Sequence, residues 1–158
     1  MRYRSVFGAG LAVCLAVSLA AAPVQAADFR ADLTGDQEVP AVETDAMGLA
    51  LFQFVRVFGQ ERLITARIDV GLSGPVVGAH IHNAPAGENG PIVLDFANGV
   101  ILSGVVKLNV NSAADLEGPL QGLTLQDLRA LMDEGSTYIN VHTEANPDGE
   151  IRGQIEED

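Results

Sequence analysis

Three histidines are placed where their side chains could bind one metal ion. His80 and His82 lie two residues apart in the segment Ala79-His80-Ile81-His82, which has the pattern of a strand. Side chains two apart on a strand project from the same face, roughly 6–7 Å apart, which lets both imidazoles reach one ion at about 2 Å. His142 ends a second predicted strand, so it supplies a third ligand if the two strands are neighbours.

The residue types favour copper as the metal. Neutral imidazole suits copper, zinc, nickel and iron, and copper(II) stands highest in the divalent affinity order. Three imidazoles without a thiolate leave a coordination position open, which is typical of exchange or redox sites rather than closed structural zinc. We therefore expect a copper ion, with zinc as the alternative metal. A metal-free, hydrogen-bonded histidine cluster is the other interpretation, and the sequence favours no single fourth ligand among Met47, Glu144, Asp148 and Glu150.

Two polar residues near His142 are candidates for orienting a ligand imidazole. The segment Asn146-Pro147-Asp148-Gly149 is a turn signal, since proline presets φ and glycine tolerates the last position. This turn should place Glu150 opposite His142, where its carboxylate could fix the imidazole tautomer. Asn140 shares a strand face with His142 and is the second candidate, with Asn83 as a further one. The alternative for Glu150 is a surface ion pair near Arg152, worth about 1 kcal/mol or less.

The chain that must position these residues is predicted to be all-β. Alternating apolar and polar residues, punctuated by Gly, Pro and Asn, predict an antiparallel sandwich or barrel of about eight strands, superoxide-dismutase-like or immunoglobulin-like. One segment instead repeats leucine at helical spacing, with a capping box at Thr124 and Asp127 and a stop at Gly135, so we expect a helix over 125–133. The strands are expected at residues 29–33, 48–57, 63–70, 76–82, 91–96, 101–110, 137–142 and 150–155.

Composition and the first residues predict an exported protein. Arg2 and Arg4 precede an apolar stretch and small residues before Ala26, as in a secretory signal peptide over residues 1–26, with one domain over 27–158. Residues 27–158 hold seven basic and 21 acidic side chains, a formal charge of −14 that should repel nucleic acid. No stretch in this range is long and apolar enough for a membrane span. The only cysteine, Cys14, lies in the signal segment, which excludes disulfides and cysteine catalysis from the exported domain and suits a periplasmic or secreted location.

Several motifs together resemble the CHRD domain, a module named from the extracellular protein chordin and also found singly in secreted bacterial proteins. The resemblance covers nearly all of residues 27–158 and implies an all-β extracellular domain, but it supplies no reaction. It departs from the family pattern at Asn83, where glycine is common. The motifs that carry it are LTGDQEVP at 33–40, LSGP at 72–75, AHIH at 79–82, GPIV at 90–93, the helix segment from 123 to 135, YINVHT at 138–143 and NPDGEIRGQ at 146–154.

A weaker likeness connects the histidine pattern to the copper half of copper–zinc superoxide dismutases. The resemblance implies that His80 and His82 are copper ligands, that His142 is the distant ligand, and that Arg152 is a guide for anions. The chain lacks the cysteines of that family, and its three histidines are too few for a full copper site plus a bridged zinc. A cross-strand ion pair is the alternative role for Arg152, and likeness of fold does not establish activity.

Three functions follow from the sequence as alternatives. The first is an exported copper-binding protein for storage, delivery, resistance or redox. The second is a metal-free extracellular module that binds proteins or mediates adhesion, and the third is a copper enzyme of dismutase or oxidase type. Neither a Gly-x-Ser-x-Gly elbow nor a phosphate-binding glycine loop occurs, so no catalytic motif is established. A symmetric homodimer is the expected association, because exposed strand edges need cover.

Overall fold

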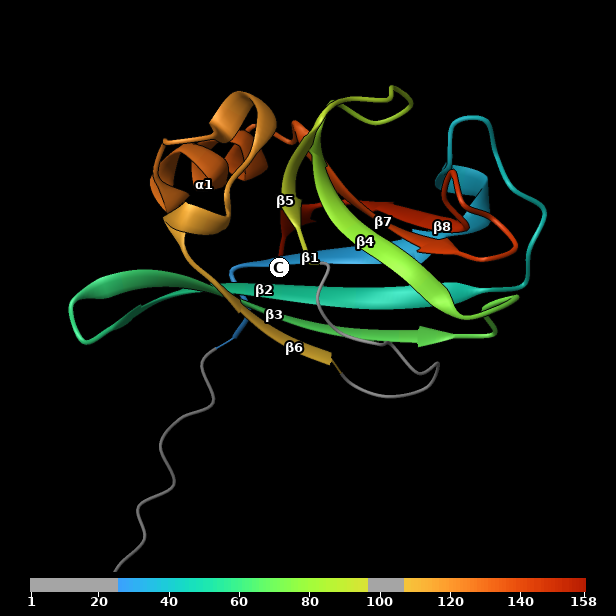
Figure 1. Ribbon diagram of the computed structural model, residues 1–158, viewed down its shortest axis with the longest axis horizontal. Helices are drawn as coiled ribbons and strands as arrows, with labels where there is room; N and C mark the ends of the chain where they lie inside the picture. The colour runs from blue at the N-terminus through green and yellow to red at the C-terminus, as the bar shows by residue number, and fades with distance from the viewer. Residues whose placement is uncertain (1–25, 97–106) are drawn as a thin grey trace, which may run out of the picture.

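A single antiparallel sheet curls into an open half-barrel in the computed structural model, which describes residues 26–96 and 107–158 (Figure 1). The strand order is β5-β4-β7-β8-β1-β2-β3-β6, and the short β9 pairs with β1. The prediction of an all-β sandwich or barrel with one short helix is confirmed, and the single curled sheet is closer to the barrel than to the sandwich. The strands are β1 (Phe29–Thr34), β2 (Met47–Val57), β3 (Gln60–Val70), β4 (Val76–Asn83), β5 (Ile92–Asp95), β6 (Lys107–Asn111), β7 (Thr137–Thr143), β8 (Ile151–Gln154) and β9 (Glu156–Glu157).

Two sequence predictions fall wholly or partly outside the described residues. Nearly all of the expected signal segment, residues 1–25, lies there, and so does the first part of the strand expected over 101–110. The described helices include none with the length and hydrophobicity of a membrane span. Three short 3-10 helices complete the described elements, at η1 (Gly35–Gln37), η2 (Ala113–Asp115) and η3 (Gly118–Leu120).

Alternation along the strands builds the core on the concave side of the sheet. The longest pairing joins β2 to β3 from Met47↔Val70 to Val57↔Gln60, and the turn between them uses Phe58 and Gly59, both with positive φ. Two positive φ values match the right-handed strand twist of a two-residue hairpin turn. Alternate residues of β3 are buried from Leu63 to Asp69, and so are Ala50 and Phe52 of β2. The fully buried core side chains include Phe29, Leu33, Phe52, Leu63, Ile81, Leu94, Ile139 and Ile151.

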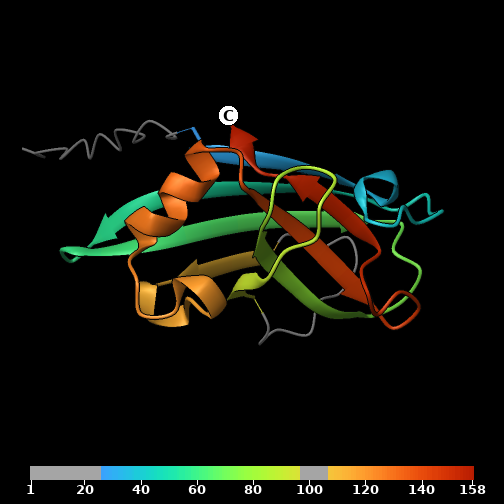
Figure 2. The same ribbon diagram turned by 90° about the horizontal axis from the view of Figure 1, so that it is seen from above.

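The helix α1 (Leu125–Asp133) closes one end of the curl, with the bounds expected from the sequence (Figures 1 and 2). The Thr124 hydroxyl accepts from the Asp127 amide while the Asp127 carboxylate accepts from the Thr124 amide, which confirms the capping box. Leu128 and Met132 are buried in the core. The helix therefore covers apolar strand surface, as its leucine spacing predicted.

The pairing of β4 with β7 determines where the histidines lie. These strands are antiparallel, with His80 opposite Asn140 and His82 opposite Tyr138. Ala79 and Ile81 of β4 point into the core, so the histidines on either side of them point to the opposite face. The loop at residues 84–91 folds over this same face (Figure 2). The three histidines are thus held on two hydrogen-bonded strands, β4 and β7, and are covered by a loop.

Candidate metal centre

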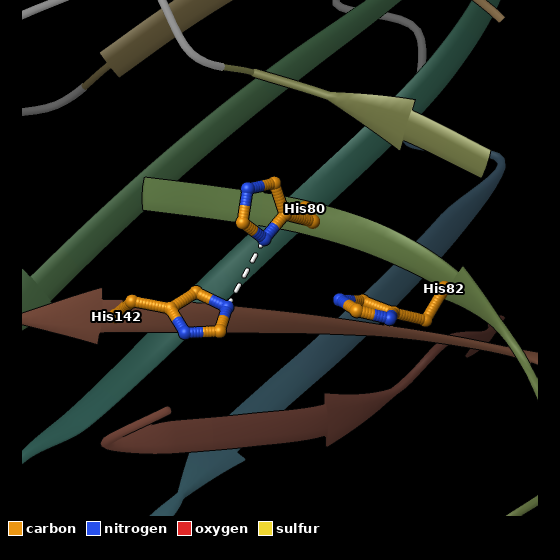
Figure 3. A group of neighbouring side chains, drawn as sticks. All are labelled: His80, His82 and His142. Carbon is orange, nitrogen blue, oxygen red and sulfur yellow. Dashed lines mark hydrogen bonds between the residues drawn. The ribbon is translucent and has the colours of Figure 1, made fainter. Parts of the chain in front are cut away.

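The structure brings the three predicted histidines together. One ring nitrogen from each of His80, His82 and His142 lies within 4.8 Å of the others, and the rings lie next to one another beside β4 and β7 (Figure 3). His80 and His142 are the closer pair, with Nδ1 of the first 3.0 Å from Nε2 of the second. Two nitrogens that are each about 2 Å from one ion lie no more than about 4 Å apart, so the rings would have to turn closer together to bind it.

Two backbone carbonyls fix the tautomers of His82 and His142. His82 Nδ1 lies 2.8 Å from the Gly90 carbonyl oxygen, and His142 Nδ1 lies 3.0 Å from the Pro147 carbonyl oxygen. A carbonyl can only accept, so each Nδ1 carries the proton and each Nε2 keeps its lone pair. The Nε2 of His82 is buried and has no hydrogen-bond partner among the described residues. Both rings thus present an unprotonated nitrogen to the space between the strands, as metal-binding histidines do.

His80 is the third histidine of the cluster, and its second ring nitrogen faces β5. Its Nε2 lies 3.7 Å from Oδ1 of Asp95, which is its partner residue on β5. This distance is too long for a hydrogen bond, whereas His80 Nδ1 forms one with His142 Nε2 (Figure 3). Because His142 Nε2 is the acceptor, His80 Nδ1 carries the proton, and an ion bound at Nδ1 would move this proton to Nε2, beside Asp95. Two nitrogens that bind one ion at 2.0–2.1 Å with angles of 90–110° are about 2.9–3.4 Å apart. The 3.0 Å between His80 Nδ1 and His142 Nε2 is the length of their hydrogen bond, and it is also compatible with this range.

The glycine at position 78 gives the two closest rings their space. Gly78 lies opposite His142 in the β4–β7 pairing. A Cβ built there would be 3.0 Å from His80 Cε1 and 3.7 Å from His142 Cδ2. Any larger residue would therefore push the His80 ring away from its position. The sequence analysis did not identify this residue, because a single glycine in a strand carries no metal-binding signal by itself.

Burial keeps the imidazoles neutral. It lowers the pKa of His80 to about 4, with a further contribution from the neighbouring His142, and the nearby Asp95 opposes the shift only in part. Burial also lowers the pKa of His82 and of His142, although the carbonyls of Gly90 and Pro147 act in the other direction. Neutral imidazole is the form that coordinates metal, so the site is ready for an ion at neutral pH without losing protons first.

The low pKa of His80 predicts that the metal-free protein loses stability in mild acid. The unfolded chain takes up a proton at His80 near pH 6.5, whereas the folded protein resists protonation until about pH 4. The stability contributed by the neutral ring is therefore complete above pH 6.5 and decreases as the pH falls toward 4. Urea unfolding midpoints of the metal-free protein should fall between pH 7 and pH 4.5, and His80→Gln should show a smaller fall. An equal pH dependence in both proteins would contradict this assignment.

Asn140 lies directly at the site. Its side-chain oxygen Oδ1 is 3.0 Å from His142 Nε2. Because Nε2 is an acceptor in the tautomer fixed by Pro147, we assign the NH2 group of Asn140 rather than Oδ1 to this position, which exchanges the two ends of the amide. Asn140 therefore occupies the metal-facing nitrogen of His142, and an incoming ion would displace this contact.

The structure places Glu150 elsewhere. Its buried carboxylate accepts hydrogen bonds from the hydroxyls of Thr44, Ser73 and Thr143 and from the Ser73 amide, at 2.7–3.2 Å, and not from an imidazole. Its backbone amide donates to the Val141 carbonyl before β8 begins, so strand alternation does not set the direction of this side chain. The side chain of Thr143 lies on the core face of β7, and the side chain of His142 lies on the other face. The turn of residues 146–149 thus directs Glu150 to the other face of the sheet.

The fourth-ligand candidates from the sequence do not join the histidines. The described metal-ligating side chains that cluster here are the three histidines alone, without Glu144, Asp148 or Glu150. Met47 is 55% exposed at the start of β2, far along the sheet from β4 in strand order. The nearest carboxylate is Asp95, which the sequence analysis missed. Only the pairing of β5 with β4 brings Asp95 beside His80, and this pairing has no signal in the sequence.

Arg152 clamps the loop that covers the site. Its guanidinium lies 3.4 Å above the Tyr138 ring, which in turn stacks on His82 with centroids 4.7 Å apart. It donates to the carbonyls of Pro85 and Glu88 and to the side chain of Asn89. This arrangement differs from both roles expected for Arg152, because the guanidinium neither pairs with a carboxylate nor points free for an anion. It holds the loop whose Gly90 carbonyl sets the His82 tautomer.

Removing this clamp should weaken metal binding from a distance. Arg152→Met keeps the apolar volume over Tyr138 and deletes the charged hydrogen bonds to the loop, each worth about 1.5–3 kcal/mol. We expect the affinity for a metal ion to be about 10–100-fold lower, as for other losses of an outer partner of a metal ligand, together with reduced stability. Competition titration and urea unfolding measure the two effects. Arg56→Met is the matched control, since Arg56 is exposed on β2, and an affinity unchanged in Arg152→Met would separate the loop from the site.

Comparison with known proteins gives one match. The model of the CHRD domain family matches residues 29–155, which includes both histidine strands and the covering loop. No curated protein matches the chain. No solved structure matches it either.

Proposed function

The chain belongs to the CHRD domain family, and from its histidine cluster we propose that it is an exported copper-binding protein whose His80, His82 and His142 hold one ion. The observation that carries the proposal is the pair of carbonyl contacts that leave Nε2 of His82 and His142 unprotonated and facing each other. A cluster whose only purpose was to order the fold would pair each buried nitrogen. Here His82 Nε2 is buried without a partner among the described residues, and a metal ion would satisfy it.

Copper is the metal that suits this donor set best. The ligands are three neutral imidazoles with no thiolate, and copper(II) binds such nitrogen sites more strongly than the other divalent first-row ions. Asp95 supplies negative charge beside His80, which attracts the cation and orients the ring. Zinc fits the same nitrogens and is the competitor that a binding experiment must include.

Binding for storage, delivery or resistance is favoured over an enzymatic role. A dismutase-like reaction would use a free cation to guide an anion to the metal, but the guanidinium of Arg152 is held by the covering loop and by Tyr138. The signal-like first residues and the acidic composition support a periplasmic or secreted protein. An exported site with an open position and neutral imidazoles is suited to take up an ion and to release it to a partner.

A copper titration of the protein purified without a histidine tag tests the proposal. We expect one equivalent of copper(II) to bind, with nitrogen coupling in the electron paramagnetic resonance spectrum, and zinc to compete less strongly. Mutation of all three histidines to Gln should remove the signal. If copper binds without nitrogen coupling, or if the triple variant binds equally well, the histidines are structural and the alternative of a protein-binding or adhesion module takes over.

We also propose that the protein forms a symmetric homodimer. The convex face of β2 and β3 exposes Met47, Ile68 and Val70, which a second copy would cover without opposing charges. Sedimentation velocity at micromolar concentration should give the mass of two chains. Ile68→Glu should shift the protein to the monomer, whereas a wild-type mass of one chain at this concentration would contradict the dimer.

A further inference from the structure

A cavity lies apart from the histidines, between the loop before β2 and the turn between β7 and β8. It has a volume of about 310 Å3, which is enough for a small organic molecule. Its lining combines apolar surface with two carboxyl side chains and includes no basic residue. The residues that matter for its chemistry are Glu38, Pro40, Val42, Ala145, Pro147 and Asp148.

Hydrogen bonds hold both walls of the cavity in place. On one wall, the Val42 amide donates to the Gly35 carbonyl at 2.9 Å, and Asn89 Nδ2 donates to the Val39 carbonyl at 2.7 Å. On the other wall, the Gly149 amide donates to the Asn146 carbonyl at 3.1 Å, and the Asn146 side chain donates to Ser73 Oγ. The cavity is thus formed before any ligand enters, which lowers the entropic cost of binding.

Glu38 is the unusual group in this lining. Its side chain belongs to a residue that is only 7% exposed, and its Oε1 has no hydrogen-bond partner among the described residues. The carboxylate lies over Gly149, where an added Cβ would be 2.5 Å from Oε1, so the bare glycine is what admits it. A buried acceptor without a partner costs roughly 1–3 kcal/mol, and a cation beside the carboxylate would offset part of this cost.

The Glu38 carboxylate forms no ion pair with the described residues, and the positive charge that acts on it, Arg152, is bound to the covering loop. Burial raises its pKa to about 7, and the positive charge of Arg152 opposes this shift only in part. Arg152 is already bound to the carbonyls of Pro85 and Glu88. Asp148 is the other charged group in the lining and adds negative potential. A cation would therefore be stabilised in this cavity and an anion repelled.

We propose that this cavity binds a small organic cation of the alkylammonium type, whose charged nitrogen lies beside the Glu38 carboxylate. The apolar part of the ligand packs against Pro40, Val42 and Pro147, and Asp148 adds long-range attraction at the rim. This site shares no metal-binding side chain with the histidine cluster, although Pro147 belongs to both: it lines the cavity, and its carbonyl contacts His142. The class of ligand follows from the lining: two carboxyl groups, apolar walls and a fixed volume of about 310 Å3.

Nuclear magnetic resonance titration of the metal-free protein with n-butylammonium at pH 8 tests the proposal. At this pH Glu38 is ionised and the probe is charged. We expect saturable shifts confined to the amides of residues 38–42 and 145–149, and binding at least ten times weaker for n-butanol, which has the same apolar part without the charge. Shifts that increase linearly without saturation, or equal binding of the neutral probe, would overturn the proposal.

Three variants complete the test. Glu38→Gln should weaken n-butylammonium binding at least tenfold, whereas Asp36→Asn, which removes an exposed acid two residues away, should change it less than twofold. If Glu38→Gln is poorly folded, Ala145→Leu fills the cavity from an exposed position and should abolish the shifts by itself. Retention of binding in folded Glu38→Gln or in Ala145→Leu would show that the cation binds elsewhere. Copper binding should be normal in Ala145→Leu, so the two proposals fail separately.

Discussion

His82→Ala is expected to lower the affinity for copper(II) by more than about 100-fold, beyond what the loss of an outer hydrogen-bond partner costs. The reason is that His82 supplies a buried Nε2 whose lone pair accepts no hydrogen bond from the described residues. The two remaining imidazoles belong to different strands and leave the ion with half of its coordination open to water. Competition titration against a chelator of known affinity measures the difference.

Met47→Ala is the matched control for this substitution. Met47 was a candidate fourth ligand from its residue type, but it is exposed at the start of β2 and does not belong to the histidine cluster. Its removal should change the copper affinity less than threefold. Because His82 also stacks on Tyr138, the fold of His82→Ala must be checked by circular dichroism. A folded His82→Ala protein with wild-type affinity would exclude His82 as a ligand.

The predictable parts of the fold are those in which apolar residues recur at the strict spacing of a strand or a helix. Alternation gave the strands that carry the histidines to within one residue, with 76–82 expected and Val76–Asn83 observed. The capping box and Gly135 gave the exact bounds of α1, since both act through local hydrogen bonds at the helix ends. Pairing between distant strands has no such local signal. The sequence therefore did not distinguish a curled single sheet from a sandwich.

The same difference explains which site residues were found. His80 and His82 share a face because the strand period is two, and this holds whatever the partner strand is. The carbonyls of Gly90 and Pro147, which set the tautomers, carry no side-chain signal at all. Glu150 was expected opposite His142 by extending the strand backwards through a tight turn. Gly149 has φ 130° there, so the chain leaves the strand geometry just before Glu150 and the extrapolation does not apply.

Glu150→Ala should have the largest effect on stability, a loss of about 3–5 kcal/mol. The carboxylate is fully buried and accepts from Thr44 in the loop before β2, from Ser73 in the loop before β4, and from Thr143 at the end of β7. Hydrogen bonds to a charged acceptor contribute about 1.5–3 kcal/mol each, and alanine would leave several buried donors without a partner. Urea unfolding of the metal-free protein at pH 7 measures the loss.

Two further variants separate this role from one at the metal. Glu150→Gln keeps one acceptor oxygen, and the neighbouring hydroxyls can rotate to accept hydrogen bonds from its NH2. The Ser73 backbone amide can only donate, so it cannot adapt in this way. We therefore expect a smaller loss of stability, about 1–2 kcal/mol. Glu144→Ala removes an exposed acid at the same end of β7 and should cost less than about 0.5 kcal/mol. Neither variant should change the copper affinity more than threefold.

The pH dependence of these variants identifies the charge on Glu150. Burial acts to raise its pKa, but the hydrogen bonds from Thr143, Ser73 and Thr44 outweigh it and hold the pKa below the ordinary 4.5. A lowered carboxyl pKa means that this stability is present above pH 4.5 and is lost as the pH falls below it. The difference in unfolding midpoint between wild type and Glu150→Gln should therefore be constant from pH 7 to 5 and shrink below 4.5. A copper affinity reduced 10-fold or more in a Glu150→Gln protein of unchanged stability would instead place the carboxylate at the imidazoles, as the turn alone predicted.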